Sequence, residues 1–345
     1  MPYVRNAWYV GAWSKDLASE RPLGLRILGE PIVVWRDKKG QFTALEDRCV
    51  HRLAPLSLGR CEGEQLRCMY HGFLFDRTGQ VVEIPGQDII PPGAKVRSYK
   101  VVERHGWLWI WMGDTALADE ALIPPAIGPD HPDYLLGTGQ LDYEAEARLI
   151  NDNLLDFSHL SFVHESSFGS SQSWARNQPR ITMLDRGVRF ERWIENESGM
   201  PGRQYDRPFD RYSRYDFLIP GVLLMTGGVF ALGTAKALHH GAPDLAKAES
   251  GVNFTSQAVT PTADKTSRYF YSWGPRRDHG GVEMRDMLME IATRAFIEDR
   301  AIIEGQQRIV DATEAPRIMP TAADRGITLF NRLVDQLARR EGGKN

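Results

Sequence analysis

Two pairs of cysteine and histidine constrain this 345-residue chain more than any other feature of its sequence. Cys49-Val50-His51 is followed, after residues 52–67, by Cys68-Met69-Tyr70-His71. Turn-forming residues flank both pairs, which indicates that each pair lies at the tip of a hairpin-like loop. Two of the chain's three cysteines take part in the pattern. The fold must therefore bring two loop tips together around a shared metal centre.

Three interpretations of this pattern are open, two with a metal and one without. A structural zinc ion accepts two cysteines and two histidines, but zinc fingers group the cysteines together and the histidines together. A redox or catalytic role for the thiols leaves the histidines unexplained. A Rieske-type [2Fe–2S] cluster uses two cysteines on one iron and two histidines on the other, which matches one of each per loop. We expect Cys49, His51, Cys68 and His71 to hold such a cluster, with Cys61 outside the pattern.

A second group of potential metal ligands lies in the segment 151–164, NDNLLDFSHLSFVH. The apolar residues of this segment indicate burial, and burying an unpaired charge or imidazole costs several kcal/mol. If residues 148–159 form a helix, Asp156 and His159 share one face, whereas His164 lies roughly 140° from His159. The two histidines therefore meet only if the helix ends between them. The segment is either a metal site or a pair of core histidines satisfied by hydrogen bonds.

A long helix is the expected source of a third ligand. The longest periodic apolar pattern of the chain predicts a helix over residues 282–311, and Asp299 falls on its buried stripe, where a lone carboxylate is costly. Glu298 faces another direction and is expected to be a solvated helix charge. Asp299 is either a metal ligand or the structural partner of an arginine such as Arg148 or Arg294.

The pattern of short strands predicts the domain organisation. Over residues 1–115, runs rich in valine, isoleucine, tryptophan and tyrosine alternate with turn residues, which is typical of an all-β domain. Residues 116–138 are rich in proline and read as a connector. Residues 139–345 predict an α+β domain, in which an antiparallel sheet built mainly from residues 180–275 is covered by the long helix, and residues 327–338 form a last helix.

Composition excludes several classes of function. The net charge of −3 does not suggest binding to nucleic acid or to an anionic membrane surface. No stretch approaches the roughly 18–20 apolar residues that a membrane span needs, and the N-terminal residues do not read as a secretory signal. Three cysteines are too few for a disulfide framework, so we expect a reducing compartment, the cytoplasm. The chain has no Walker loop or GxGxxG motif, so no nucleotide or flavin site of its own is expected.

Together these motifs resemble the Rieske non-haem iron oxygenases, the oxygenase components of aromatic-ring hydroxylases and O-demethylases. The segments NAWYVGAW, CVHRLAPLSLG, CMYHGFLFD, WIWMGD and DNLLDFSHLSFVH are similar to the branch that contains vanillate O-demethylase and dicamba monooxygenase. The resemblance covers essentially the whole chain. It implies a helix-grip catalytic domain with a mononuclear Fe(II) held by two histidines and one carboxylate, here His159, His164 and Asp299.

The resemblance also implies how electrons reach the iron. In the family, an aspartate three residues before the first histidine ligand bridges to a cluster histidine of the neighbouring subunit; here these residues are Asp156 and His71. The cluster of the same chain is then too distant, so the working unit is a head-to-tail homo-oligomer, a homotrimer. A separate reductase passes electrons from NAD(P)H, directly or through a ferredoxin, and O2 is the co-substrate.

Kinship to O-demethylases suggests a substrate class. We expect O-demethylation of a methoxyaromatic acid, while aromatic ring hydroxylation, methyl-group oxidation and N-dealkylation by the same iron chemistry stay open. His239 and His240 lie in a loop-like stretch and are candidates for binding a substrate carboxylate or phenolate. An alternative of another class is a Rieske electron-transfer protein without catalysis. Such a protein would end near residue 115 and would not need the second site.

Overall fold

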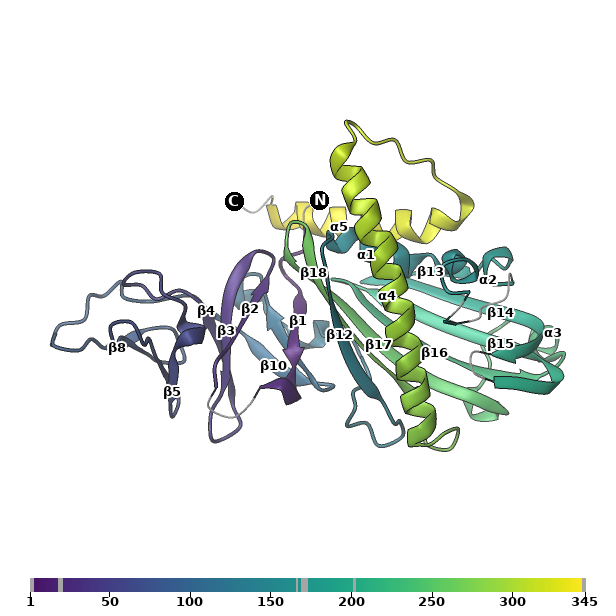
Figure 1. Ribbon diagram of the computed structural model, residues 1–345, viewed down its shortest axis with the longest axis horizontal. Coiled ribbons are helices and arrows are strands. Elements are labelled where there is room, and N and C mark those ends of the chain that lie inside the picture. The colour runs from purple at the N-terminus through teal and green to yellow at the C-terminus, as the bar shows by residue number, and fades with distance from the viewer. Residues whose placement is uncertain (1–2, 18–20, 166, 169–172, 201–202, 343–345) are drawn as a thin grey trace. The chain divides into compact units, whose positions relative to one another are not determined.

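The structure of the protein is a computed structural model that describes residues 3–17, 21–165, 167–168, 173–200 and 203–342 (Figure 1). The chain divides into two compact units. The smaller unit comprises residues 5–123 and 260–264, and the larger unit comprises the rest. The division at residue 123 falls inside the segment 116–138 that the sequence marks as a connector. Among the described residues, no helix is long and apolar enough to cross a bilayer.

The smaller unit is built from short antiparallel strands in three sheets. The strand orders are β1-β11-β10, β2-β3-β4-β9 and β5-β6-β7-β8. The strand bounds are β1 Trp8–Trp13, β2 Leu23–Ile27, β3 Glu30–Arg36, β4 Phe42–Glu46, β5 Arg60–Glu62, β6 Gln65–Arg67, β7 Leu74–Phe75, β8 Val81–Glu83, β9 Ser98–Tyr99, β10 Val101–Arg104 and β11 Trp107–Trp111. Strands β1 and β11 are buried along their whole length, because nearly all of their side chains are aromatic or aliphatic. The expected all-β N-terminal domain is confirmed.

The hairpin turns of this unit have the chemistry that the sequence indicates. Between β3 and β4, Asp37 Oδ1 accepts hydrogen bonds from the backbone N–H groups of Lys39 and Gln41, both at 2.9 Å. Between β7 and β8, Gly79 has a φ of +83°, and a Cβ at this position would collide with the carbonyl oxygen of Val96. Only glycine avoids both problems, so this turn depends on it.

The larger unit is organised by a seven-stranded antiparallel sheet in the order β12-β18-β17-β16-β15-β14-β13 (Figure 1). The strand bounds are β12 Gly137–Tyr143, β13 Arg180–Leu184, β14 Gly187–Met200, β15 Arg203–Leu218, β16 Val222–Ala231, β17 Ser250–Ala263 and β18 Thr266–Pro275. The helix bounds are α1 Ala147–Leu155, α2 Ser173–Arg176, α3 Thr234–Ala237, α4 Val282–Ala312 and α5 Arg325–Gly342. The expected antiparallel sheet with a long C-terminal helix is confirmed.

Helix α4 runs across the strands of this sheet (Figure 1). Its buried side chains include Ile291, Ala295 and Asp299, which are the four-residue steps of the apolar stripe. The hydroxyl of Tyr143 on β12 donates to the carbonyl of Phe296 at 3.0 Å, inside the buried contact. The stripe and this hydrogen bond fix the rotation of α4 about its own axis, and with it the direction of Asp299.

Side chains of α4 also fix the start of α1. Gln307 Oε1 accepts from the backbone N–H of Glu146 at 3.0 Å, and Glu304 Oε1 accepts from that of Glu144 at the same distance. Glu146 is the N-cap residue of α1, and its own side chain makes no capping hydrogen bond. These two hydrogen bonds join the backbone that leads into α1 to α4, so the two helices are held together at the point where α1 begins.

Helix α5 packs against the sheet through one aromatic side chain. Phe330 is fully buried, and its ring lies 4.8 Å from that of Phe217 in an edge-to-face arrangement. At Gly326, one turn earlier, a Cβ would collide with the ring of Phe190, so the helix approaches the sheet closely there.

We predict that Phe330→Ala lowers the free energy of unfolding by about 3–5 kcal/mol, because it removes a buried ring and leaves a cavity. Chemical denaturation followed by circular dichroism measures the change. The control is Arg332→Ala, an exposed position on the same helix, which should shift stability by no more than about 0.5 kcal/mol. Equal effects of the two substitutions would show that α5 does not pack as described.

Candidate metal centres and substrate cavity

The two cysteine loops of the smaller unit have the same backbone conformation. The N–H of Cys49 donates to the carbonyl of Ala54 at 2.9 Å, and the N–H of Cys68 donates to that of Phe73 at 2.8 Å. In each loop the residue four positions after the cysteine has a positive φ and donates its N–H to the cysteine carbonyl. Each loop is therefore closed on itself, and the two present their cysteines in the same way.

The loops place thiols inside and imidazoles outside. Cys49 and Cys68 are each 2% exposed, whereas the rings of His51 and His71 are exposed and lie 4.4 Å apart. Burial, and next to it the Cys68 thiol, raises the pKa of Cys49 to about 11, so the two thiols are neighbours. The structure thus pairs the predicted cysteines with each other and the predicted histidines with each other.

This pairing distinguishes the metals that the loops could hold. One tetrahedral zinc ion would need all four ligand atoms around a single point. Among the described residues, Cys49, His51, Cys68 and His71 do not form a set of three or more potential ligand atoms that all lie within 4.8 Å of one another. A [2Fe–2S] cluster that takes two thiolates on one iron and two imidazoles on the other fits two separated pairs. Cys61 is buried in the same core and belongs to neither pair.

The set that does meet the criterion lies in the larger unit and consists of His159, His164 and Asp299. Asp299 Oδ1 lies 3.6 Å from His159 Nε2 and 3.2 Å from His164 Nε2. His164 is fully buried and Asp299 is 4% exposed. The structure therefore brings together the two histidines of the segment 151–164 and the carboxylate of the long helix.

The chain reaches this arrangement by breaking the helix earlier than the sequence predicts. The expected helix to residue 159 is wrong, because α1 ends at Leu155 and a 3₁₀ helix begins at Phe157 and ends at Ser161. Asp156 stands between the two and accepts hydrogen bonds from the N–H of Ser158 at 2.8 Å and from its hydroxyl at 2.9 Å. An aspartate that caps the next turn in this way competes with continuation of the helix. His159 therefore lies on the 3₁₀ turn, and the chain delivers His164 beside it.

Hydrogen bonds set the orientation of both imidazoles. His159 Nδ1 donates to the carbonyl of Asp156 at 2.5 Å, and His164 Nδ1 lies 2.9 Å from Glu298 Oε2. In both rings the proton is held at Nδ1, which leaves Nε2 as an electron-pair donor on the side of Asp299. His164 Nε2 is buried without a hydrogen bond of acceptable geometry. A buried ring nitrogen in this state fits a metal ligand.

The charges around the two rings differ. Burial lowers the pKa of His159, despite the opposing effect of Asp299, so the ring stays neutral and available as a ligand. Burial also acts to lower the pKa of His164, but the carboxylates of Asp299 and Glu298 outweigh it and raise this pKa overall.

Glu298 is a functional candidate that the sequence argument missed. It was expected to be a solvated charge, but its side chain is 23% exposed and accepts from His164 Nδ1 and, at 2.6 Å, from the hydroxyl of Ser167. The expectation failed because it considered only the direction in which Glu298 leaves α4. The glutamate side chain is long enough to reach around the helix to a ring that Asp299 already faces.

Asn153 is the second missed residue. Its Nδ2 donates to Asp299 Oδ1 at 3.1 Å and lies 3.5 Å from His159 Nε2. Asp152, in contrast, has a supporting role in the helix, since it accepts from Asn331 at 3.2 Å and pairs with Arg148 at 3.6 Å. The position of Asn153 on the last turn of α1 gave no sign of its direction while the helix was expected to continue.

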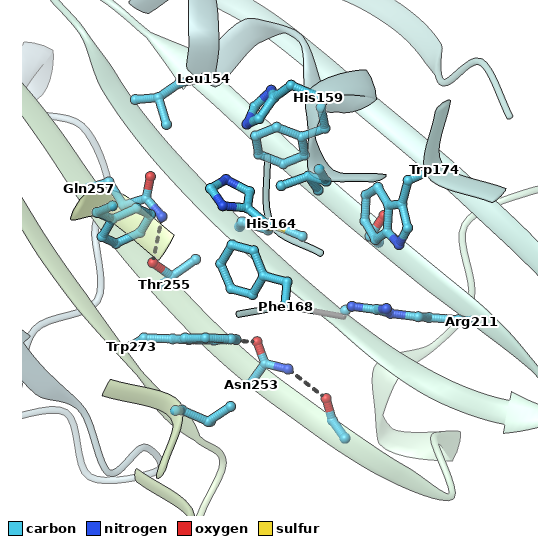
Figure 2. A pocket seen from close by; sticks show the side chains of 18 of the residues that line it. Leu154, His159, His164, Phe168, Trp174, Arg211, Asn253, Thr255, Gln257 and Trp273 are labelled. Atoms are coloured by element: carbon cyan, nitrogen blue, oxygen red, sulfur yellow. Dashed lines mark hydrogen bonds between the residues drawn. The ribbon is translucent and has the colours of Figure 1, made fainter. Parts of the chain in front are cut away.

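A cavity opens beside His159 and His164 (Figure 2). Its walls come from the segment 151–164, from Phe168 and Trp174, from α4 and from strands β15 to β18, with alternate residues of β17 on the face that lines it. The cavity, including its open mouth, encloses about 1050 Å³. The sheet residues on this face include Ser213, Met225, Asn253, Thr255, Gln257 and Trp273.

Most polar groups on this wall are already paired with one another. Trp273 Nε1 donates to Asn253 Oδ1 at 2.9 Å, and Asn253 Nδ2 donates to the carbonyl of Gly251 at 2.8 Å (Figure 2). Gln257 Nε2 likewise donates to Thr255 Oγ1 at 3.1 Å. With its amides occupied, the wall presents mainly aromatic and aliphatic surface, which suits a planar aromatic ligand.

The structure does not bring His239 and His240 to this cavity. Both follow helix α3 on an exposed turn, with φ values of 49° and 57°. His240 Nε2 lies 2.9 Å from Glu195 Oε1, and neither histidine is among the residues that line the cavity. The prediction that they bind substrate gains no support from their position.

Comparison with known proteins gives consistent matches over the whole chain. Residues 7–100 match the Rieske [2Fe-2S] domain, and residues 143–340 match the vanillate O-demethylase oxygenase C-terminal domain. The iron–sulfur subunit of a toluene-4-sulfonate monooxygenase system from Comamonas testosteroni is 35% identical over 99% of both chains. The vanillate O-demethylase oxygenase subunit of Pseudomonas sp. strain HR199 is 33% identical over 98% of this chain and 96% of the relative. The crystal structure of dicamba monooxygenase bound to dicamba covers 100% of both chains at 28% identity with a TM-score of 0.86.

We predict that Glu298→Ala weakens the binding of a divalent metal at His159, His164 and Asp299 by about 10–100-fold, because the substitution removes the acceptor that holds the His164 proton at Nδ1. Anaerobic Fe(II) titration of the metal-depleted site measures the affinity. Glu290→Ala, an exposed position on the same helix, is the matched control. Unchanged affinity in Glu298→Ala, with unchanged melting temperature, would show that Glu298 does not orient the ligand.

Proposed function

The chain belongs to the Rieske non-haem iron oxygenases of the vanillate O-demethylase type, and on this premise we propose that it uses O2 to remove the methyl group of a small methoxyaromatic acid. Membership in the family brings two cofactors, a Rieske [2Fe–2S] cluster and a mononuclear iron. The observation that carries the proposal is the position of His159, His164 and Asp299 on the wall of an aromatic-lined cavity. An electron-transfer protein without catalysis would need neither this triad nor the cavity.

We assign the cofactors to residues as follows. Cys49 and Cys68 bind one iron of the cluster, and His51 and His71 bind the other. His159, His164 and Asp299 form the two-histidine, one-carboxylate set that is typical of iron oxygenases. The mononuclear iron, when bound, supplies the activation of O2. The protein contributes the fixed Nδ1 protons of the two imidazoles and the buried carboxylate that the α4 stripe directs at them.

The cavity defines what the protein does to the substrate. Its aromatic and aliphatic wall excludes water and accepts a planar ring, and its paired amides leave few polar groups to compete for that ring. A methoxy group that lies at the triad end is the part of the substrate exposed to oxidation. Loss of the oxidised methyl carbon as formaldehyde leaves a phenol.

Electron supply follows from the surface of the smaller unit. The exposed imidazole of His71 lies 4.0 Å from the ring of Tyr70, which is 64% exposed, and the other cysteine loop carries Leu53 at 66%. We propose that a neighbouring copy of the chain covers this tip in a head-to-tail homotrimer. In this trimer the partner's Asp156 accepts a hydrogen bond from His71. A reductase, alone or through a ferredoxin, reduces the cluster with electrons from NAD(P)H. Three unpaired cysteines agree with a reducing compartment, which we propose is the cytoplasm.

A second candidate reaction is oxidation of a ring methyl group. It is favoured by the similarity to a toluene-4-sulfonate monooxygenase subunit, 35% identical over 99% of this chain. The same residues serve both reactions, because each begins at a C–H bond of a methyl group. The products separate them: O-demethylation releases formaldehyde and a phenol, whereas methyl oxidation keeps the carbon as a benzylic alcohol.

We predict that Asp299→Ala abolishes the oxidation of methoxybenzoates and lowers the iron content by one atom per chain, while the visible absorption of the cluster stays unchanged. The assay measures formaldehyde release with a surrogate reductase. Asp286→Ala, an exposed carboxylate on the same helix, should behave like the wild type. Turnover that survives in Asp299→Ala would contradict the assignment of the third ligand.

We predict that Asp156→Asn slows electron transfer from the reduced cluster to the mononuclear iron by at least about tenfold, without loss of either cofactor. Asparagine still caps the 3₁₀ turn, so the local fold is retained and only the carboxylate is lost. Rapid-mixing spectroscopy of the pre-reduced protein follows reoxidation of the cluster in the presence of O2 and substrate. Asp142→Asn, at a carboxylate that is 65% exposed, is the control. A rate equal to that of the wild type would exclude Asp156 from the electron path.

A further inference from the structure

One wall of the cavity carries an arginine for which the proposed reaction has given no role. Arg211 lies on β15, and its side chain is 18% exposed. Its guanidinium carbon lies 5.0 Å from the ring centre of Trp174, which also lines the cavity (Figure 2). Among the described lining residues, Arg211 is the one lysine or arginine. A cation on a mainly apolar wall calls for an anion.

A second arginine lies against the same indole. Arg192, on the neighbouring strand β14, is 7% exposed, and its guanidinium carbon lies 4.7 Å from the Trp174 ring centre. Its Nε and Nη1 atoms are buried and make no hydrogen bond to any described residue. Burial lowers the pKa of Arg192, and the positive charge of Arg211 acts in the same direction. The two guanidinium groups therefore repel each other across a site that has little water.

Two acidic side chains, Glu197 and Asp156, lie near these charges. Glu197 Oε2 lies 3.8 Å from Arg211 Nη1, so these two side chains form an ion pair. Asp156 acts on Arg192, but both of its oxygens accept from Ser158. Residues 169–172 and 201–202, which the structure leaves undescribed, contain no aspartate or glutamate. The buried Nε and Nη1 atoms of Arg192 still lack an acceptor among the described residues, and a buried cationic donor in this state favours an anionic ligand nearby.

We propose that Arg211, with Arg192 against the same indole, is the receptor for the anionic substituent of the aromatic substrate. This inference rests on the proposed function. The ligand chemistry is a carboxylate or a sulfonate bonded to the ring, since a guanidinium fork donates two parallel hydrogen bonds to either group. Arg211 makes the contact, and Arg192 strengthens the positive potential at the same end of the cavity.

The receptor determines which end of the substrate is oxidised. The ring of Trp174 lies 6.3 Å from that of Phe157, which in turn lies 6.4 Å from the His159 imidazole. The arginine and the triad thus occupy different parts of one cavity. A metal dication at the triad would itself attract the anion of a substrate. A separate cationic site holds that anion away from the metal and turns the uncharged end of the ring toward it.

The test measures binding to the iron-loaded protein by calorimetry, without a reductase and therefore without turnover. The ligands are 4-methoxybenzoate and 4-methylbenzenesulfonate, each with its neutral counterpart, 4-methoxybenzamide or 4-methylbenzenesulfonamide. We expect Arg211→Gln to weaken binding of the preferred anion by about 10–100-fold and to change binding of its neutral counterpart by less than about twofold. Arg211→Lys should keep part of the preference, because it keeps the charge but loses the fork.

The matched control is Arg207→Gln, which removes the same charge from an exposed position on the same strand. It should bind all four ligands as the wild type does. The visible absorption of the cluster and the melting temperature show that each variant is folded. The wild type's preference between the benzoate and the sulfonate also shows whether the anionic group of the substrate is a carboxylate or a sulfonate.

Three results would overturn the inference: Arg211→Gln binds the anions as tightly as the wild type, it loses the anion and its neutral counterpart equally, or the wild type binds neither anion. Failure of the proposed function looks different. A protein that binds an aromatic anion through Arg211 but forms no oxidised product with any reductase contradicts the reaction and leaves the receptor intact.

Discussion

The contact of Asp299 with His159 and His164 is the interaction on which the larger unit depends. Three ionisable groups meet where water is nearly excluded, at distances of 3.6 and 3.2 Å. Without a metal, such a cluster costs free energy, so its geometry must be imposed by the surrounding structure. Helix α4 imposes it, because its apolar stripe fixes the direction of the carboxylate and its polar side chains hold the start of α1. The cap at Asp156 then turns the chain so that both imidazoles reach the same point.

Sequence patterns predicted which residues lie together better than they predicted the path of the chain between them. The four-residue steps of α4 placed Asp299 inside, because helix periodicity reports burial directly. The break after Leu155 was invisible to the same reasoning, since a local side-chain hydrogen bond of Asp156 decided it. Glu298 and Asn153 were missed because their roles depend on the reach of one side chain and on where a helix stops. Both features can be seen only in the three-dimensional structure.

For the two cysteine loops, the sequence predicted which residues belong together, and the structure explains their spacing. Both loops have one backbone conformation, with the cysteine N–H bonded to a carbonyl five residues later. The histidine nevertheless follows the cysteine by two residues in the first loop and by three in the second. Because the turns are equivalent, this offset places the two imidazoles differently on similar supports, and their rings meet at 67° and not face to face. Spacing alone showed which residues belong together, but the reason for the unequal spacing is the geometry of two facing loops.

The two kinds of residue around the cavity come from different parts of the fold, and this separation has a consequence for specificity. The triad side chains lie on α4, on the 3₁₀ helix and on the turn that follows it, whereas Arg211 and the paired amides lie on the strands. Alternate strand residues can change without moving α4 or the 3₁₀ turn, because each strand is held by its backbone ladder. Relatives that share this fold are named for toluene-4-sulfonate, vanillate and dicamba, three different aromatic acids. A triad on one set of elements with an adjustable wall on another is a physical arrangement that permits such variety, because recognition of the anion and activation of oxygen are then carried by separate elements.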